Sequence, residues 1–285
     1  MLSALSSSVS ERLIFRAGGG YAGGVVCRMI SEYRLWGKIP PGFIKILDAG
    51  GRRLILRGDQ ESVLSARSWN DSAVVEEATG LQGRGQLRRV KLPNGDVALL
   101  RRYHHGGAFR RLTDGVFFTW PPRPFRELMI TEELRRLGTP TAEVYGACVE
   151  PVCGPLYRGW LATRAIPGAQ DLWAALQSGL MREAGEERCL RAVARSVREL
   201  HRQGVYHADL NLKNILLCLE NRGVTAYIID FDKAKLVLGG LPPRLAKNNL
   251  DRLLRSARKL DPEGRYLSLA RRAEFLDFYY QADGA

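Results

Sequence analysis

The sequence lacks any uninterrupted run of 18 or more apolar residues, the usual minimum for a membrane-spanning helix. Residues 1–10 lack the positive charges and long apolar core of a secretory signal, so no signal peptide is predicted. Cysteine is scarce as well: there are five, an odd number, with no Cys-x-x-Cys pair. These absences argue against a disulfide-stapled secreted domain and against a zinc site. We therefore expect a cytoplasmic protein with reduced, buried or unreactive thiols.

Lysine is also in short supply, because only eight of the 43 basic residues are lysine. The 30 acidic residues leave a formal net charge of +13 at pH 7 and an isoelectric point near 9.8. Such an excess is typical of proteins with an anionic partner, such as nucleic acid, an anionic membrane surface or a phosphorylated substrate. The preference for arginine has a second explanation, a GC-rich genome, and composition alone leaves both open.

The length of 285 residues and the hydrophobic content of 45% predict one large globular domain or two lobes. Residues 1–38 are rich in serine and glycine and show no clear periodicity. We expect them to be a disordered extension outside the fold, or the product of a mis-called start. The ordered part is predicted to begin near Pro40.

Local patterns predict regular elements in the rest of the chain. Asn94–Gly95 lies between two apolar-rich runs, which predicts a β-hairpin over residues 87–103 with both turn residues at positive φ. A one-faced apolar repeat predicts a helix over residues 189–203 that Gly204 ends. Similar patterns predict strands at 43–47, 53–57, 159–163, 215–218 and 227–229, and helices at 124–137, from 171 onward and within 244–280.

The polar residues with the strongest functional pattern lie in segments 207–214 and 228–232. Asp209 precedes Asn214 by five residues, and Asp230 follows Asn214 by 16 residues at the end of an apolar strand. This order and spacing match the catalytic and metal loops of kinases. A carboxylate such as Asp209 can take the proton of an acceptor hydroxyl, while Asn214 and Asp230 offer hard oxygen ligands for Mg²⁺. Each residue alone is more simply explained as a turn residue, but the joint pattern favours phosphoryl transfer.

The same loop contains two further candidate catalytic residues. Asn211 is expected to brace the loop by hydrogen bonding. Lys213 either approaches the γ-phosphate or is an ordinary solvated surface lysine. His207 is expected to have a structural role and is not assigned as a base.

Segment 206–216, together with residues 229–232, resembles the lipopolysaccharide core kinases of the protein-kinase-like superfamily, and the 3-deoxy-D-manno-octulosonic acid (Kdo) kinases most closely. Weaker matches extend the resemblance to about residues 40–280. It implies an α+β, bilobal protein-kinase-like fold. The N-lobe (39–165) would hold an antiparallel sheet and one helix, and the mainly helical C-lobe (166–285) would hold the catalytic loop, the metal loop and a basic tail.

The resemblance also implies an activity. The protein would use ATP and Mg²⁺ to phosphorylate a hydroxyl of Kdo in the lipid A–inner core of lipopolysaccharide. It would work as a peripheral protein on the cytoplasmic face of the inner membrane. Its partners would be the lipid-linked acceptor and the anionic membrane surface, with no nucleic acid expected. A heptose acceptor, the hydroxyl used and the oligomeric state stay open.

By motif position, the resemblance assigns Asp209 as the base and Asn214 and Asp230 as the metal ligands. Glu127 takes the position of the helix glutamate in this fold. Arg101 takes the position of its usual lysine partner, which is a departure because arginine is wider and forked. A plain edge-strand arginine is the alternative explanation for Arg101.

The resemblance assigns Gly83 and Gly85 to the glycine loop that contacts the phosphates of the nucleotide. Their backbone N–H groups precede the predicted hairpin and are able to face phosphate oxygens. The spacing Gly80-x-x-Gly83-x-Gly85 departs from the usual pattern, and glycine is common in this chain.

Other functions fit parts of the sequence. A eukaryotic-type protein kinase is disfavoured because no Ala-Pro-Glu element follows Asp230. A RIO-like or antibiotic-kinase-like phosphotransferase would share the His207–Leu210 pattern. A basic nucleic-acid-binding module would explain the charge, but no zinc-finger, RNP or helix-turn-helix pattern accompanies it. A degenerate pseudokinase is disfavoured because the three chemistry-bearing residues are all present.

Overall fold

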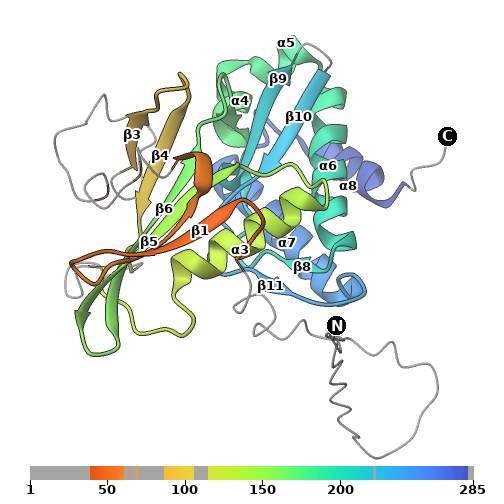
Figure 1. Ribbon diagram of the computed structural model, residues 1–285. Helices are drawn as coiled ribbons and strands as arrows, with labels where there is room; N and C mark the ends of the chain where they lie inside the picture. The colour runs from red at the N-terminus through yellow and green to blue at the C-terminus, as the bar shows by residue number, and fades with distance from the viewer. Residues whose placement is uncertain are drawn as a thin grey trace, which may run out of the picture.

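The computed structural model describes residues 39–60, 64, 69, 87–105, 115–220 and 223–281 (Figure 1). The predicted extension over residues 1–38 and the predicted phosphate-binding residues Gly83 and Gly85 lie outside the described residues. Among the helices that the structure describes, none is both long enough and apolar enough to cross a bilayer.

The N-terminal part is built around a six-stranded antiparallel sheet in the order β1-β2-β5-β6-β4-β3. Its strands are β1 Phe43–Leu47, β2 Arg53–Arg57, β3 Leu87–Lys91, β4 Val97–Arg102, β5 Val144–Cys153 and β6 Leu156–Arg164. Each face of the sheet buries its own hydrophobic cluster. The predicted strands at 43–47 and 53–57 are confirmed, whereas no pattern predicted β5, the longest of the described strands.

The β3–β4 hairpin has the predicted position but a different turn. Leu92 N–H donates to the Asp96 carbonyl oxygen at 2.8 Å, which leaves a loop of three residues between the paired strands. Gly95 has a φ of 84°, and Asn94 is not among the residues with positive φ. The Asn94 side chain instead accepts the Asp96 N–H at 3.0 Å. A three-residue loop needs only its last residue in the left-handed region, so the prediction of two positive φ angles was wrong.

Helix α3 (Arg123–Arg136) packs against β5 and β6 on one face of the sheet. It begins directly after two prolines, which cannot continue a preceding helix, and it is followed by Gly138 with a φ of 89°. Leu128 and Leu134 are buried on its inner side. The predicted helix at 124–137 is therefore confirmed to within one residue at each end.

The C-terminal part is mainly helical and has its own, larger hydrophobic core. Its helices are α4 Leu172–Ser178, α5 Leu180–Ala184, α6 Glu186–Arg202, α7 Pro243–Leu260 and α8 Leu269–Tyr280. Helix α6 packs against α8 and against β10, with its apolar stripe inward. The mixed architecture, an antiparallel sheet followed by a helical region, confirms the α+β prediction (Figure 1). The predicted boundary at 165/166 falls between β6 and the next strand, β7 Gln170–Asp171.

Two small sheets lie within the helical part. One has the order β10-β9-β7, with β9 at Ile215–Glu220 and β10 at Gly223–Ile228. The other pairs β8 Val205–Tyr206 with β11 Lys235–Leu236. Because Ile215 pairs with Ile228, the residues just before β9 and just after β10 meet at the open end of this hairpin. The two predicted functional segments are therefore neighbours through strand register.

Candidate active site

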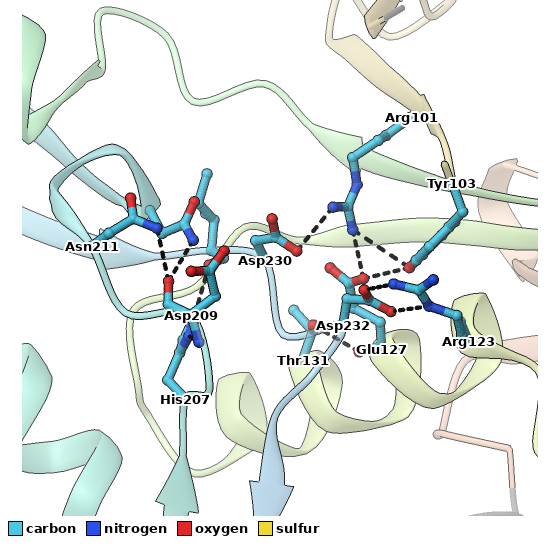
Figure 2. Close-up of polar contacts among 12 residues, drawn as sticks. Arg101, Tyr103, Arg123, Glu127, Thr131, His207, Asp209, Asn211, Asp230 and Asp232 are labelled. Atoms are coloured by element: carbon cyan, nitrogen blue, oxygen red, sulfur yellow. Dashed lines mark hydrogen bonds and ion pairs between the residues drawn. The ribbon is translucent and has the colours of Figure 1, made fainter. Parts of the chain in front are cut away.

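The catalytic loop at the start of β9 is held by two asparagine side chains (Figure 2). The Asp209 carbonyl oxygen accepts hydrogen bonds from Asn211 Nδ2 at 2.9 Å and from Asn214 Nδ2 at 2.7 Å. Asn211 Oδ1 also accepts the Lys213 N–H at 2.9 Å and so caps the short 3₁₀ turn η3 (Leu212–Asn214). The backbone of Asp209 is thus fixed by its own loop, in the way that the sequence predicted for Asn211.

The metal loop after β10 joins the catalytic loop through the backbone. Ile229 N–H donates to the Asn214 carbonyl oxygen at 3.0 Å, which brings Asn214 beside the residue that precedes Asp230. Asp230 has a φ of 70° and is the one non-glycine residue with positive φ in the part of the chain that the structure describes. Aspartate tolerates this conformation better than most residues, yet a strained backbone costs about 1–3 kcal/mol. Strain of this kind is concentrated at functional sites in proteins.

His207 links the catalytic loop to the metal loop through its two ring nitrogens. Its Nδ1 accepts the Asp209 N–H at 3.2 Å, so the ring proton lies on Nε2, which donates to the Ile229 carbonyl oxygen at 3.0 Å. Burial lowers the pKa of His207, and the neutral ring is the form that both hydrogen bonds require. His207 therefore ties the loops together, and its two ring nitrogens are both in use.

An ion-pair cluster from the N-terminal part meets the metal loop (Figure 2). Arg101 on β4 donates from Nη2 to Glu127 Oε2 of α3 at 2.5 Å and from Nη1 to Asp230 Oδ1 at 2.9 Å. The Tyr103 hydroxyl donates to the same Glu127 oxygen. The pairing expected between Arg101 and Glu127 is thus present. The forked guanidinium contacts Glu127 and Asp230 through two different nitrogens, whereas a lysine has one nitrogen for both carboxylates.

Burial governs the electrostatics of this cluster. Glu127 is only 2% exposed, and burial raises its pKa to about 7 although the charge of Arg101 acts in the opposite direction. Burial alone would lower the pKa of Arg101, but the negative charges of Glu127 and Asp230 raise it well above its ordinary value. The guanidinium is therefore a permanent cation at the point where the sheet, α3 and the metal loop meet.

A second ion pair fastens α3 to the metal loop. Arg123, the first residue of α3, forms a two-pronged contact with the Asp232 carboxylate, with Nε 2.7 Å from Oδ1 and Nη2 bonded to Oδ2. Arg126 Nη2 donates to the Ala234 carbonyl oxygen at 2.5 Å. Asp232 stands where the kinase Asp-Phe-Gly pattern has glycine. In this structure its carboxylate holds Arg123 at the start of α3.

The catalytic loop is also clamped from the helical part. Asn249 on α7 is completely buried; its Oδ1 accepts the His207 N–H at 3.0 Å and its Nδ2 donates to the His207 carbonyl oxygen at 2.8 Å. His201 on α6 lies with Nε2 3.2 Å from Asn249 Oδ1 and Nδ1 2.7 Å from the Tyr279 hydroxyl of α8. Burial lowers the pKa of His201 to about 4. Three helices therefore support the backbone of His207, two residues before Asp209.

Comparisons with known proteins show the family of the chain. The family model described as lipopolysaccharide kinase (Kdo/WaaP) family matches residues 67–279. The chain belongs to this family. The 3-deoxy-D-manno-octulosonic acid kinase of Pasteurella multocida is 34% identical over 183 residues, which cover 62% of this chain and 73% of the relative. The enzyme of the same name from Vibrio cholerae is 32% identical over 209 residues, covering 72% and 83% of the two chains.

A solved structure titled "WaaP in complex with acyl carrier protein" has a TM-score of 0.50 and covers 81% of this chain and 89% of its own. Its sequence identity of 20% shows a shared fold and no more. The family resemblance predicted from two loops is confirmed, and membership in the Kdo/WaaP family makes the chain a kinase, a phosphotransferase that acts on a sugar hydroxyl.

Most residues predicted for the site of this lipopolysaccharide kinase lie together. Asp209, Asn211, Asn214 and Asp230 gather at the end of the β9–β10 hairpin, and Arg101 and Glu127 face them. Lys213 is exposed on the same loop.

Sequence reasoning missed three residues that complete the cluster: Tyr103, Arg123 and Asn249. Asn249 could have been identified from the sequence, because it is a polar residue at a buried position of α7, in line with Ala246 and Leu253. No sequence pattern identifies Arg123.

The metal-binding capacity of the site is limited to a small donor set. Among the described residues, no group of three or more histidine, cysteine, aspartate or glutamate side chains could hold a metal ion. The Asn214 amide donates through Nδ2 to the Asp209 carbonyl, so its oxygen is the end turned away from that carbonyl. One amide and one carboxylate oxygen, from Asn214 and Asp230, fit Mg²⁺, which keeps several waters and relies on substrate phosphates for other ligands. Two protein ligands are too few for a metal site in which the protein supplies every ligand.

Proposed function

We propose that this lipopolysaccharide kinase transfers the γ-phosphate of ATP to a hydroxyl of Kdo in the lipid A–inner core of lipopolysaccharide. The observation that carries the proposal is the convergence of Asp209, Asn214 and Asp230 beside the Arg101–Glu127 pair. These are the side chains that phosphoryl transfer needs: a proton acceptor, oxygen ligands and a fixed cation. The names of the relatives, 3-deoxy-D-manno-octulosonic acid kinase, support the choice of acceptor.

Asp209 is proposed as the base. The acceptor oxygen attacks the γ-phosphorus, its proton passes to the Asp209 carboxylate, and the bond to the β-phosphate oxygen breaks to release ADP. The backbone of Asp209 is held by Asn211, Asn214 and His207, so its carboxylate has a fixed origin. Positioning of this kind, together with electrostatic stabilisation, accounts for most of what a protein contributes to phosphoryl transfer.

Asn214 and Asp230 are proposed to hold Mg²⁺. When bound, the ion would neutralise charge on the phosphates during transfer. Asp230 Oδ1 lies 2.9 Å from Arg101 Nη1, so a fixed positive charge adjoins the carboxylate proposed as a metal ligand.

Arg101 is proposed to contact the phosphates of ATP in the role that lysine has elsewhere in the fold. A guanidinium has five N–H donors, so Arg101 can keep Glu127 as a partner while it donates to a phosphate oxygen. Gly83 and Gly85 are proposed to contribute backbone N–H groups to the same phosphates, and Lys213 is proposed to approach the γ-phosphate.

We also propose a location on the cytoplasmic face of the inner membrane, where a lipid-linked acceptor would be presented. The net charge of +13 supports this, because each basic residue near an anionic leaflet contributes about 1 kcal/mol of binding. A heptose of the same inner core is the alternative acceptor, since the described contacts do not distinguish the two sugars.

The test is phosphate transfer from labelled ATP to Kdo–lipid A and, separately, to a heptose-bearing inner core, with and without EDTA. Asp209→Ala is expected to abolish transfer, and EDTA is expected to do the same. The matched control is Asp251→Ala, which removes a half-buried carboxylate on α7 that pairs with Lys247. Equal transfer by Asp209→Ala and wild type would remove Asp209 from the mechanism, and label on the heptose acceptor alone would reassign the substrate.

A further inference from the structure

One end of the six-stranded sheet carries an exposed surface without charge. It consists of residues 118–120, before α3, and residues 151–156, at the tip of the β5–β6 hairpin; we name it the apolar tip. Phe118 is 72% exposed and Trp120 is 82% exposed, and all six residues of the hairpin tip are exposed too. None of these nine residues is charged, although 26% of the chain is. The hairpin tip projects at the lower left of Figure 1.

The two segments of the apolar tip are joined by hydrogen bonds. Phe117 and Tyr157 exchange two backbone hydrogen bonds, of 2.7 and 3.0 Å. The buried Tyr157 hydroxyl bonds the Thr119 hydroxyl and accepts the Arg123 N–H at 2.9 Å, so it fastens both ends of the segment before α3. The exposed aromatic rings therefore stand on a hydrogen-bonded support, which lowers the entropy that would be lost when they are buried by a partner.

Cations flank the apolar tip on the same side of the sheet. Leu47, at the end of β1, is 72% exposed and pairs in register with the exposed Arg53. Lys45 is exposed two residues earlier on β1, and residues two apart on a strand share a face. The β1–β2 turn lies alongside the hairpin tip, since a Cβ on Gly51 would be 3.6 Å from Pro151 Cγ. The surface is thus apolar at its end and carries the exposed Lys45 and Arg53 at its side, where Asp48 is paired with Arg52.

Tryptophan and phenylalanine beside basic residues are the combination that binds a bilayer interface. Trp and Tyr rings sit at the level of the headgroups, apolar side chains enter the acyl boundary, and basic residues meet anionic lipids. A folded protein partner would fit an apolar patch as well, but it would not account for the net charge of +13 and the flanking cations.

We propose that the apolar tip inserts into the surface of an anionic bilayer and orients the enzyme there. Helix α3 begins three residues after Trp120, and its first residue, Arg123, holds Asp232 two residues beyond Asp230. The tip is therefore connected directly to the helix that carries Glu127, so the orientation of the tip at a membrane would fix the orientation of the site. The inference rests on the proposed function in one respect: the lipid-linked acceptor is the reason why the enzyme would be at a membrane.

The test is co-sedimentation of the full chain with vesicles that contain neither nucleotide nor acceptor, so its result does not depend on kinase activity. Vesicles of phosphatidylcholine are compared with vesicles containing phosphatidylglycerol. We expect wild type to bind the anionic vesicles more strongly, and Phe118→Ser/Trp120→Ser to weaken that binding about tenfold. The matched control is Leu269→Ser/Tyr280→Ser, which removes two side chains that are 79% and 68% exposed on α8.

A second measurement reports insertion directly. Cys153 is the exposed member of the four cysteines in the described ranges and lies within the apolar tip. A polarity-sensitive fluorophore on Cys153, in a Cys27→Ser background, is expected to shift to the blue with anionic vesicles. The proposal is overturned if the fluorophore does not shift, if the tip variant binds as wild type does, or if the control loses as much binding. It is also overturned if the tip variant only converts a dimer to a monomer.

If vesicles bind through the tip but no acceptor is phosphorylated, the proposed function fails and the membrane surface stands. If transfer to Kdo–lipid A occurs but the tip variant binds vesicles like wild type, the reverse holds.

Discussion

Replacement of Asn249 with alanine is expected to slow catalysis although this side chain is completely buried and belongs to α7. The amide holds both the N–H and the carbonyl oxygen of His207, at 3.0 and 2.8 Å. Its loss removes the support of the His207 backbone, two residues before Asp209. The carboxylate proposed as the base is then held less firmly, although Asn211 and Asn214 still bond the Asp209 carbonyl. A displacement of about 1 Å at a catalytic group can cost on the order of 100-fold in rate.

The cost in stability follows from the same contacts. Asn249→Ala leaves one donor and one acceptor of His207 and the Nε2–H of His201 without their partner in a dry environment. Each buried polar group without a partner costs about 1–3 kcal/mol, and part of this is recovered if water enters. We expect the free energy of unfolding to fall by roughly 3 kcal/mol and kcat to fall at least tenfold, with a smaller change in the KM for ATP.

The assay combines urea unfolding with steady-state kinetics at a temperature where the variant remains folded. Asn248→Ala is the matched control, because Asn248 is the exposed neighbour of Asn249 on the same helix. A variant Asn249→Ala with the unfolding midpoint and kcat of Asn248→Ala would refute the clamp. An increase in KM for ATP with unchanged kcat would show that Asn249 acts on nucleotide binding instead.

Three further outcomes are expected. Burial raises the pKa of Glu127 to about 7, so the folded state binds more protons than the unfolded state between pH 4.5 and 7, and stability from this group falls as the pH rises through that window. Glu127→Gln should remove that slope in urea unfolding; parallel pH profiles for variant and wild type would contradict it. A double-mutant cycle of Arg123→Ala and Asp232→Ala should give a coupling energy of about 1–3 kcal/mol, and additive effects would mean that the pair does not hold α3. Gly146→Ala should lower the free energy of unfolding by about 1–3 kcal/mol, because its Cβ would lie 2.5 Å from a methyl group of Leu56 and 2.9 Å from the Ile55 carbonyl oxygen. The control is Gly58→Ala, whose nearest contact would be 3.5 Å. Equal melting temperatures of the two variants would argue against overpacking at Gly146.

Much of the local structure was predictable because its causes are local. The strands at 43–47 and 53–57 and the helix at 124–137 follow from apolar runs and from the prolines and glycine at their ends. The convergence of Asp209, Asn214 and Asp230 was predictable for a related reason. Asn214 and Asp230 lie next to the ends of two short apolar strands whose spacing suits a hairpin, and Asp209 precedes Asn214 by only five residues.

Strand β5 and the contacts of α3 were not predictable in this way. β5 contains Gly146 and Pro151, which disfavour a strand when only neighbours in sequence are considered. The reason for Gly146 lies on β2, where Leu56 comes too close for any side chain. The pairing of Arg123 with Asp232 spans 109 residues, and nothing in either local pattern specifies it.

The sequence by itself therefore determined the two loops of the site, the helices that show a clear apolar period and the family to which the chain belongs. The tertiary structure decided how those loops are held: Asn249 on one side, and Arg101, Glu127 and Arg123 on the other. The physical reason is that periodicity and spacing act within a few residues along the chain. A hydrogen bond or ion pair to the loop depends on which side chains folding brings within about 3 Å, and that depends on all the intervening packing.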